Sequence, residues 1–124
     1  MKKTIAAAIL FTSMISFADQ LVVCANLKAI EELSKMETES YVVRNYRSVT
    51  GEYLRLVSRR IYELADEAYV STARSDRLIE VVSASYALMQ QAQKTENVEP
   101  GVVGVRFENL RTIAKSAQTD FQCR

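Results

Sequence analysis

The amino-acid sequence predicts an all-α protein, a small antiparallel bundle of about four helices stapled by one disulfide. Three observations indicate this fold class. Apolar residues recur with the 3.6-residue period of a helix in four segments, and no alternating apolar run is long enough to indicate a strand. The 124 residues include one proline and three glycines, so few positions interrupt a helix. The two cysteines lie near the two ends of the helical part.

Residues 1–18 have the order of a secretory signal peptide. Lys2 and Lys3 give a positive start, an uncharged apolar stretch follows, and small residues precede a cleavage site after Ala18. The apolar stretch is shorter than the roughly 18 residues of a membrane-spanning helix, and no later segment is long and apolar enough to be a transmembrane segment. We therefore predict a soluble protein, exported to the periplasm or secreted, with a single helical domain over residues 19–124.

The position of the cleavage site decides whether Cys24 belongs to the mature protein. Cleavage after Ala25 is an alternative that would remove Cys24 and leave Cys123 alone. A lipoprotein is a second alternative, but it needs a small residue before the lipidated cysteine, where this chain has Val23. The site after Ala18 is better formed than either alternative, so we expect both cysteines to remain.

The first two helices are predicted over residues 20–37 and 40–72. One face of the first holds Val22, Ala29, Ile30, Leu33 and Met36. The second carries a broad apolar stripe of Val42, Tyr46, Val49, Tyr53, Leu56, Val57, Ile61, Leu64 and Ala68. Gly51, in the middle of the second, costs about 1 kcal/mol relative to alanine. A break of the helix at Gly51 therefore stays open.

The third and fourth helices are predicted over residues 76–94 and 102–121, separated by a loop that Pro100 and two glycines indicate over 97–105. Ser75 is the expected N-cap of the third helix. Its apolar face holds Leu78, Ile79, Val82, Tyr86 and Met89. The apolar residues of the fourth alternate steps of four and three, at Val103, Phe107, Leu110, Ala114, Ala117 and Phe121. Such a seam is typical of a bundle helix.

Cys24 lies near the start of the first predicted helix, and Cys123 lies just past the end of the fourth. In an up-down-up-down bundle with short loops these two points are at the same end. A Cys24–Cys123 disulfide is therefore predicted. A loop of about 100 residues closed in this way is stabilised by at most about 4.7 kcal/mol through the lost entropy of the unfolded chain.

The composition argues against several classes of active site. The chain has no histidine, the commonest general base, metal ligand and haem ligand. Its cysteines have no CxxC spacing, and no EF-hand, P-loop or GxSxG pattern is present. We therefore predict no catalytic residue, no metal and no cofactor. The net charge of +1, or −1 without Lys2 and Lys3, gives no general attraction to nucleic acid or anionic membrane.

The most distinctive local feature is the segment 41–62, which combines five arginines and four tyrosines with a single acid, Glu52. If the segment is one helix, one side of it, roughly 27 Å long, lies away from the apolar stripe. That side holds Arg44, Arg47, Arg55, Arg59 and Tyr62. Arginine and tyrosine are enriched at binding hot spots, so we predict that these five residues bind a protein partner. The alternative is a solvated face, partly neutralised by pairs such as Arg59 with Glu63.

Two tyrosines and one arginine of the same segment have other predicted places. Tyr46 and Tyr53 lie in the apolar stripe and are expected in the core. Arg60 also falls inside the stripe, near Glu63 and Glu67. Because an unpaired buried guanidinium is prohibitive, Arg60 either pairs with one of these acids or reaches solvent, through a bend of the helix before it or by snorkelling. We expect the second.

The leading functional prediction is a small exported protein that is not an enzyme and acts as an inhibitor, adaptor or chaperone-like partner. One alternative is an envelope-associated binder of an anionic polymer through the same arginines. A weaker alternative is a glycan hydrolase, which needs two carboxyl groups across a cleft. Its candidates are Glu31, Glu32, Glu39, Glu63, Asp66 and Glu67, which we expect to be solvated charges on helix faces.

Overall fold

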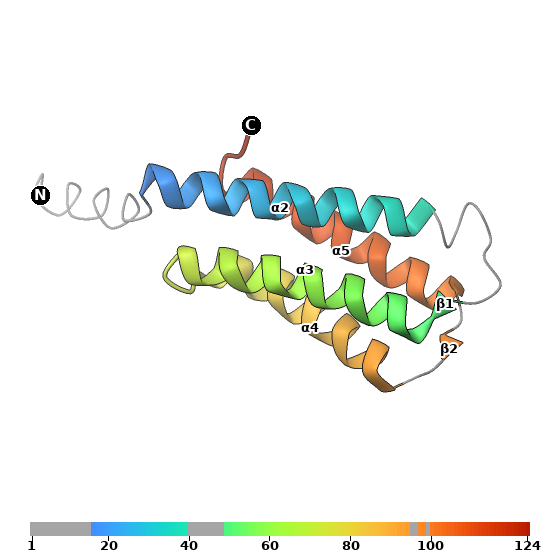
Figure 1. The fold of residues 1–124 in the computed structure, drawn as a ribbon. Coiled ribbons are helices and arrows are strands. Elements are labelled where there is room, and N and C mark those ends of the chain that lie inside the picture. Colours follow the sequence, from blue (N-terminus) through green and yellow to red (C-terminus); the bar gives the residue numbers. More distant parts are fainter. Residues whose placement is uncertain (1–15, 40–48, 95–96, 99) are drawn as a thin grey trace, which may run out of the picture.

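The computed structural model describes residues 16–39, 49–94, 97–98 and 100–124. Over these residues the protein is an antiparallel helical bundle (Figure 1). Its long helices are α2 (Phe17–Thr38), α3 (Gly51–Ser71), α4 (Ile79–Lys94) and α5 (Pro100–Asp120). A 3₁₀ turn, η2 (Asp76–Leu78), leads into α4, and two-residue strands, β1 (Val49–Thr50) and β2 (Asn97–Val98), precede α3 and α5. The predicted all-α bundle is confirmed.

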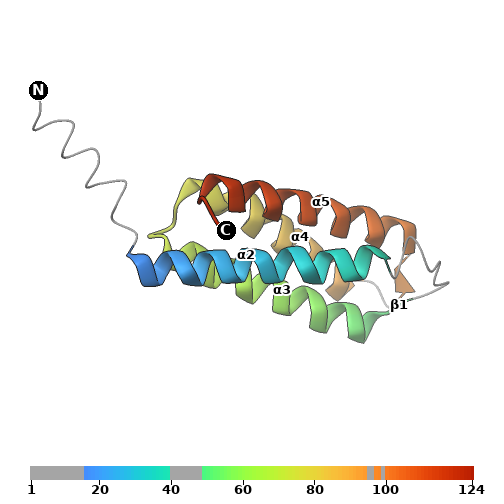
Figure 2. The same ribbon diagram turned by 90° about the horizontal axis from the view of Figure 1, so that it is seen from above.

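The four helices follow one another around the bundle in chain order. Helix α2 packs against α3 and, most extensively, against α5, while α4 packs against α3 and less extensively against α5. Figures 1 and 2 show the helices side by side along their length, with both strands at one end. At that end β1 and β2 pair antiparallel, with Val49 opposite Val98. The arrangement is therefore up-down-up-down.

A seam of buried residues with steps of three and four runs along every helix. In α5 it comprises the five predicted residues from Val103 to Ala117, and the sixth, Phe121, continues it directly after the end of the helix. The seam of α2 is Val23, Leu27, Ile30, Ser34 and Glu37; that of α3 is Leu54, Ser58, Ile61, Ala65 and Ala68; and that of η2 and α4 is Leu78, Val81, Ser85, Leu88 and Ala92. This alternation is the packing pattern of coiled coils and four-helix bundles.

The end of the bundle opposite the strands is closed covalently. The predicted Cys24–Cys123 disulfide is present, with 5.5 Å between the two Cα atoms. Two side chains from other elements bind carbonyl groups at the end of α5 and directly after it. Gln20 Nε2 donates to the carbonyl oxygen of Phe121 (3.0 Å), and Arg77 Nη1 donates to that of Asp120 (3.2 Å). The chain end that holds Cys123 is thus attached to both α2 and η2.

The break left open at Gly51 is present, and the loop predicted before the fourth helix is shorter than expected. Helix α3 begins at Gly51, and the two residues before it form β1, so the helix expected over 40–72 is interrupted there. Valine and threonine favour strands, and glycine is a weak helix former. The loop expected over 97–105 is shorter, because α5 already begins at Pro100. Proline suits the first turn of a helix, where its missing N–H has no partner to lose.

The buried stripe of α3 is also rotated relative to the prediction. Tyr53 and Leu56, expected inside, are 48% and 62% exposed, because the seam passes through Leu54 and Ser58. Arg60 is exposed at its place in α3 and forms an ion pair with Glu63, with 3.9 Å between nitrogen and oxygen. The expectation that Arg60 falls inside the stripe is therefore wrong, and it reaches solvent within an α-helix that continues to Ser71. The N-cap prediction at Ser75 is confirmed, since its Oγ accepts from the N–H of Arg77 (3.3 Å).

Candidate binding surface on α3 and α4

The residues predicted to bind a partner are divided by the boundary at Gly51. Arg44 and Arg47 lie outside the described residues. Arg55, Arg59 and Tyr62 all belong to α3, and their spacing of four and three places them along one edge of that helix. That edge faces α4, because Arg55 and Arg59 share a pocket with α4 and Tyr62 contacts an α4 ring. The structure therefore brings these three predicted residues together.

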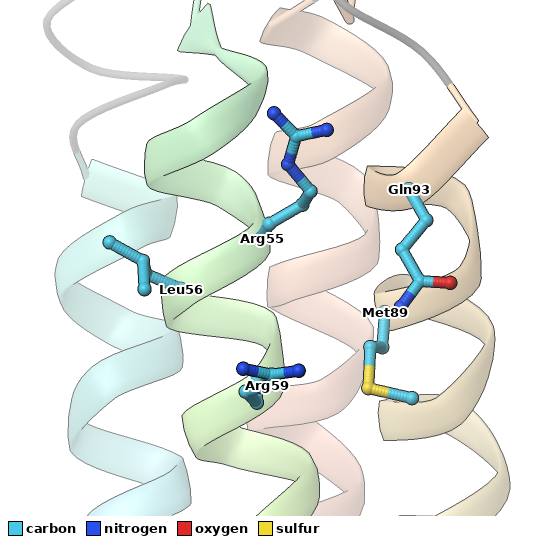
Figure 3. A pocket seen from close by; sticks show the side chains of 5 residues that line it. All are labelled: Arg55, Leu56, Arg59, Met89 and Gln93. Carbon is cyan, nitrogen blue, oxygen red and sulfur yellow. The ribbon is translucent and has the colours of Figure 1, made fainter.

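A pocket of about 150 Å³ lies where Arg55 and Arg59 approach α4. Met89 and Gln93 line it from α4, and Leu56 lines it from α3. Figure 3 shows the two guanidinium groups on α3 opposite the side chains of Met89 and Gln93, with Leu56 on the side of α3 nearer α2. The methylene stems of arginine and the thioether of methionine are apolar, so the pocket combines apolar walls with a positive rim.

An aromatic pair lies beside the pocket, about one turn further along both helices. The ring centroids of Tyr62 and Tyr86 are 5.7 Å apart, and their planes are inclined by 51°. Gln90 Nε2 donates to the hydroxyl oxygen of Tyr86 (2.9 Å). We call the pocket and this pair together the Arg–Tyr surface. Its residues are Arg55, Leu56, Arg59 and Tyr62 of α3 and Tyr86, Met89 and Gln93 of α4.

Sequence reasoning missed the contribution of α4. Tyr86 and Met89 were expected in the core, but Tyr86 is 44% exposed and Met89 is only partly buried. A usable signal was present, because Tyr86, Met89 and Gln93 follow the same steps of three and four as the seam of α4, displaced by one position. Residues so displaced lie at the flank of a helix, where a neighbouring helix meets solvent.

The two arginines of the surface form no ion pair with a described side chain. The ion pairs among residues that the structure describes join Arg60 to Glu63 and Arg111 to Glu108. The Arg59–Glu63 pair that the solvated-face alternative named is absent from these described contacts, since Glu63 pairs with Arg60 instead. Arg55 and Arg59 are both exposed. An exposed guanidinium without a partner keeps all of its donors for an external anion.

The carboxylates considered for hydrolysis do not surround this pocket. Glu32, Glu39, Asp66 and the other acidic candidates are absent from its lining, which consists of two arginines, leucine, methionine and glutamine. Glu31 lies between α2 and α5, where it accepts a hydrogen bond from Gln118 Nε2 (3.2 Å). Within the described segments, no group of three metal-ligating side chains could hold an ion.

One acidic side chain is buried outside the predicted set. Glu37 is only 5% exposed, at the strand end of the α2 seam, and accepts a hydrogen bond from the hydroxyl group of Tyr53 (2.7 Å). A second pair, Glu108 with Arg111, lies on α5. The hydrogen bond from Arg111 lowers the pKa of Glu108 below its ordinary value of 4.5, and the carboxylate in turn raises the pKa of Arg111.

The arrangement defines a disulfide-linked antiparallel helical bundle with a positively charged, partly apolar surface on α3 and α4. None of the helices that the structure describes is both long and apolar enough to cross a membrane. Comparisons with protein families, with curated proteins and with solved structures find no match for this chain.

Proposed function

We propose that this chain is a small exported protein that binds another protein through the Arg–Tyr surface, as an inhibitor, adaptor or chaperone-like partner and without enzymatic activity. One observation carries the proposal. Arg55 and Arg59 are exposed without an ion pair among the described side chains, directly beside an apolar-walled pocket and a tyrosine pair. Arginine, tyrosine and an apolar pocket together are the composition of binding hot spots.

Export is supported by the chemistry of the fold. Disulfides persist in oxidising compartments such as the periplasm or the cell exterior. The Cys24–Cys123 disulfide and the lack of a membrane-spanning helix in the described part of the chain are compatible with that location. The signal-peptide pattern at residues 1–18 predicts the same location independently.

The test is capture of a partner by the oxidised protein from an envelope extract, followed by identification of the partner and measurement of its affinity. Alanine at Arg55 and Arg59 should reduce that affinity by about tenfold or more, because a hot-spot arginine contributes more than 1 kcal/mol. The control is Arg60→Ala, which removes one positive charge from the neighbouring position of α3 and is compared with the single variant Arg59→Ala. Equal affinity of the Arg55→Ala/Arg59→Ala variant and the unchanged protein would contradict the proposal.

Salt dependence separates the protein partner from the anionic-polymer alternative. Binding to a polyanion releases counterions, so its affinity falls steeply as salt rises. A partner with an apolar anchor in the pocket should keep most of its affinity at high salt, because burial of apolar surface is not screened. If log affinity falls linearly with log salt concentration, by about one released ion per arginine, and no affinity remains at high salt, the polymer is favoured instead.

A further inference from the structure

The order of side chains along the Arg–Tyr surface indicates what kind of partner segment binds there. We propose, on the basis of the protein-binding function above, that the partner contributes an acidic amphipathic helix that packs lengthwise over α3 and α4. The occupant is thus a fifth helix supplied by another protein. The spacing of the side chains, their charges and the pocket all match such a helix.

The spacing along α3 matches a helical partner. Arg55, Arg59, Tyr62 and Asp66 follow steps of four, three and four, so they lie along one edge of α3 over about 16 Å. A second helix laid alongside presents its own residues at the same steps. Two carboxylates one turn apart on that helix can therefore meet Arg55 and Arg59 simultaneously.

The charge along this edge changes sign, which fixes the order of charges on the partner. The two arginines lie toward the strand end of α3, and Asp66 is exposed about one turn beyond Tyr62. A complementary helix has its acids at the arginine end and a basic residue opposite Asp66. Such an order of charges specifies alignment as well as attraction.

The apolar part of the surface comes mainly from α4. Met89 lies at the arginine end, in the pocket of about 150 Å³, and the tyrosine pair lies between the arginines and Asp66. Leucine side chains on the partner, one turn apart, would contact Met89 in the pocket and then Tyr62 with Tyr86. Methionine adapts its shape to such insertions at low cost. The acids of the partner would then flank buried leucines, as they do on an amphipathic helix.

The same features disfavour a uniformly anionic polymer as the occupant. The described part of the surface offers two unpaired arginines, and Asp66 on the same edge repels a polyanion. A phosphate or sulfate chain also makes no use of Met89 or of the exposed Leu56. A helix that carries both acids and leucines uses all of these groups.

The inference can be tested with a synthetic helical peptide of about 18 residues. The peptide has glutamate at positions i and i+4, leucine at i+3 and i+7, and lysine at i+11, on an alanine and glutamine background. Its matched control has the same composition with the leucines moved to the opposite face. We expect titration into the ¹⁵N-labelled oxidised protein to shift amide resonances of α3 and α4, and the control peptide to bind about tenfold more weakly. A polyphosphate titration at the same salt concentration gives the polymer outcome.

Three variants test the geometry. Arg59→Ala and Met89→Ala should each weaken peptide binding by about fivefold or more, as expected for losing about 1 kcal/mol. Arg60→Ala removes a charge from the next position and should leave binding within about twofold. Equal losses for Arg59→Ala and Arg60→Ala would show attraction by net charge alone and overturn the inference. Unchanged binding by the Met89→Ala variant would overturn it too, because α4 would take no part.

Failure of this inference is distinguishable from failure of the proposed function. If the captured partner depends on Arg55 and Arg59 but the peptide binds no better than its control, a protein partner exists and is not an acidic helix. If partner capture does not depend on these arginines, the protein-binding function itself is wrong at this surface. Stronger binding of polyphosphate than of the peptide would also overturn the helix inference.

Discussion

The two long faces of the bundle are built differently. On the α2–α5 face, the Cys24–Cys123 disulfide and the hydrogen bond from Gln118 to Glu31 join the helices directly. On the α3–α4 face, a tyrosine pair joins the helices, and two exposed arginines have no ion pair with a described side chain. The first face contributes to stability with the groups it holds. The charged groups of the second face contribute little to the stability of the isolated protein. They therefore remain free to bind a partner.

The largest effect should come from breaking the covalent link on the α2–α5 face. Replacement of Cys24 and Cys123 by serine should lower the free energy of unfolding by about 2–5 kcal/mol, because the unfolded chain regains the freedom that the closed loop removes. Urea unfolding of the variant and of the oxidised protein measures this. A loss below about 1 kcal/mol would mean that the other contacts between α2 and α5 hold the two helices together without the disulfide.

A smaller effect is expected where α2 is bonded to α3. Asn26 is buried, and its Nδ2 donates to the carbonyl oxygen of Leu64 (3.1 Å). Asn26→Ala should cost about 1–3 kcal/mol, through the lost hydrogen bond and the space left behind. Asn109→Ala on the exposed surface of α5 is the control and should change stability by less than about 0.5 kcal/mol. Similar urea midpoints for the two variants would contradict this role of Asn26.

Substitutions on the α3–α4 face should hardly change the stability of the protein. Alanine at both Arg55 and Arg59 should leave the free energy of unfolding within about 0.5 kcal/mol, because neither side chain has an ion pair with a described residue. Thermal unfolding followed by circular dichroism measures this directly. A destabilisation of more than about 1 kcal/mol would assign the arginines to the fold and remove the contrast between the two faces.

The smallest effect concerns pH and the Glu108–Arg111 pair on α5. The pKa of Glu108 is lowered in the folded protein, so its contribution to stability is present above the ordinary value of 4.5 and is lost as pH falls through the lowered pKa. Both side chains are partly exposed, at 35% and 44%, so solvent screens the pair and the contribution is small. Glu108→Gln should therefore lower the melting temperature slightly at pH 7 and leave it unchanged at pH 2. An equal decrease at both pH values would assign the loss to packing.

The predictability of each helix depended on where its large side chains lie. In α5 every seam position is apolar, so the periodicity identified the buried face correctly. In α3 the seam includes Ser58, while Tyr53 and Leu56 lie beside it. Because the prediction placed these larger apolar residues inside, the predicted stripe is rotated relative to the buried one. Tyr53 can lie outside because its hydroxyl group bonds to Glu37, a contact between two helices that periodicity within one helix does not reveal.

The surface was half predictable for a similar reason. The excess of arginine and tyrosine in one segment identified Arg55, Arg59 and Tyr62 without knowledge of the fold. Their α4 partners, Tyr86 and Met89, required the pairing of two helices. A helical period locates a face but does not say whether a large apolar residue lies at its centre or at its edge.

The disulfide also determines how the protein carries mechanical force. It joins residues 99 positions apart, so the described helices lie almost entirely inside one covalent ring. Tension between a tether on the N-terminal side of Cys24 and one at Arg124 passes through the sulfur–sulfur bond and bypasses the helices. A partner or surface that pulls on these two points would therefore leave the Arg–Tyr surface in shape, whereas in the reduced protein the same pull would draw α2 away from α5.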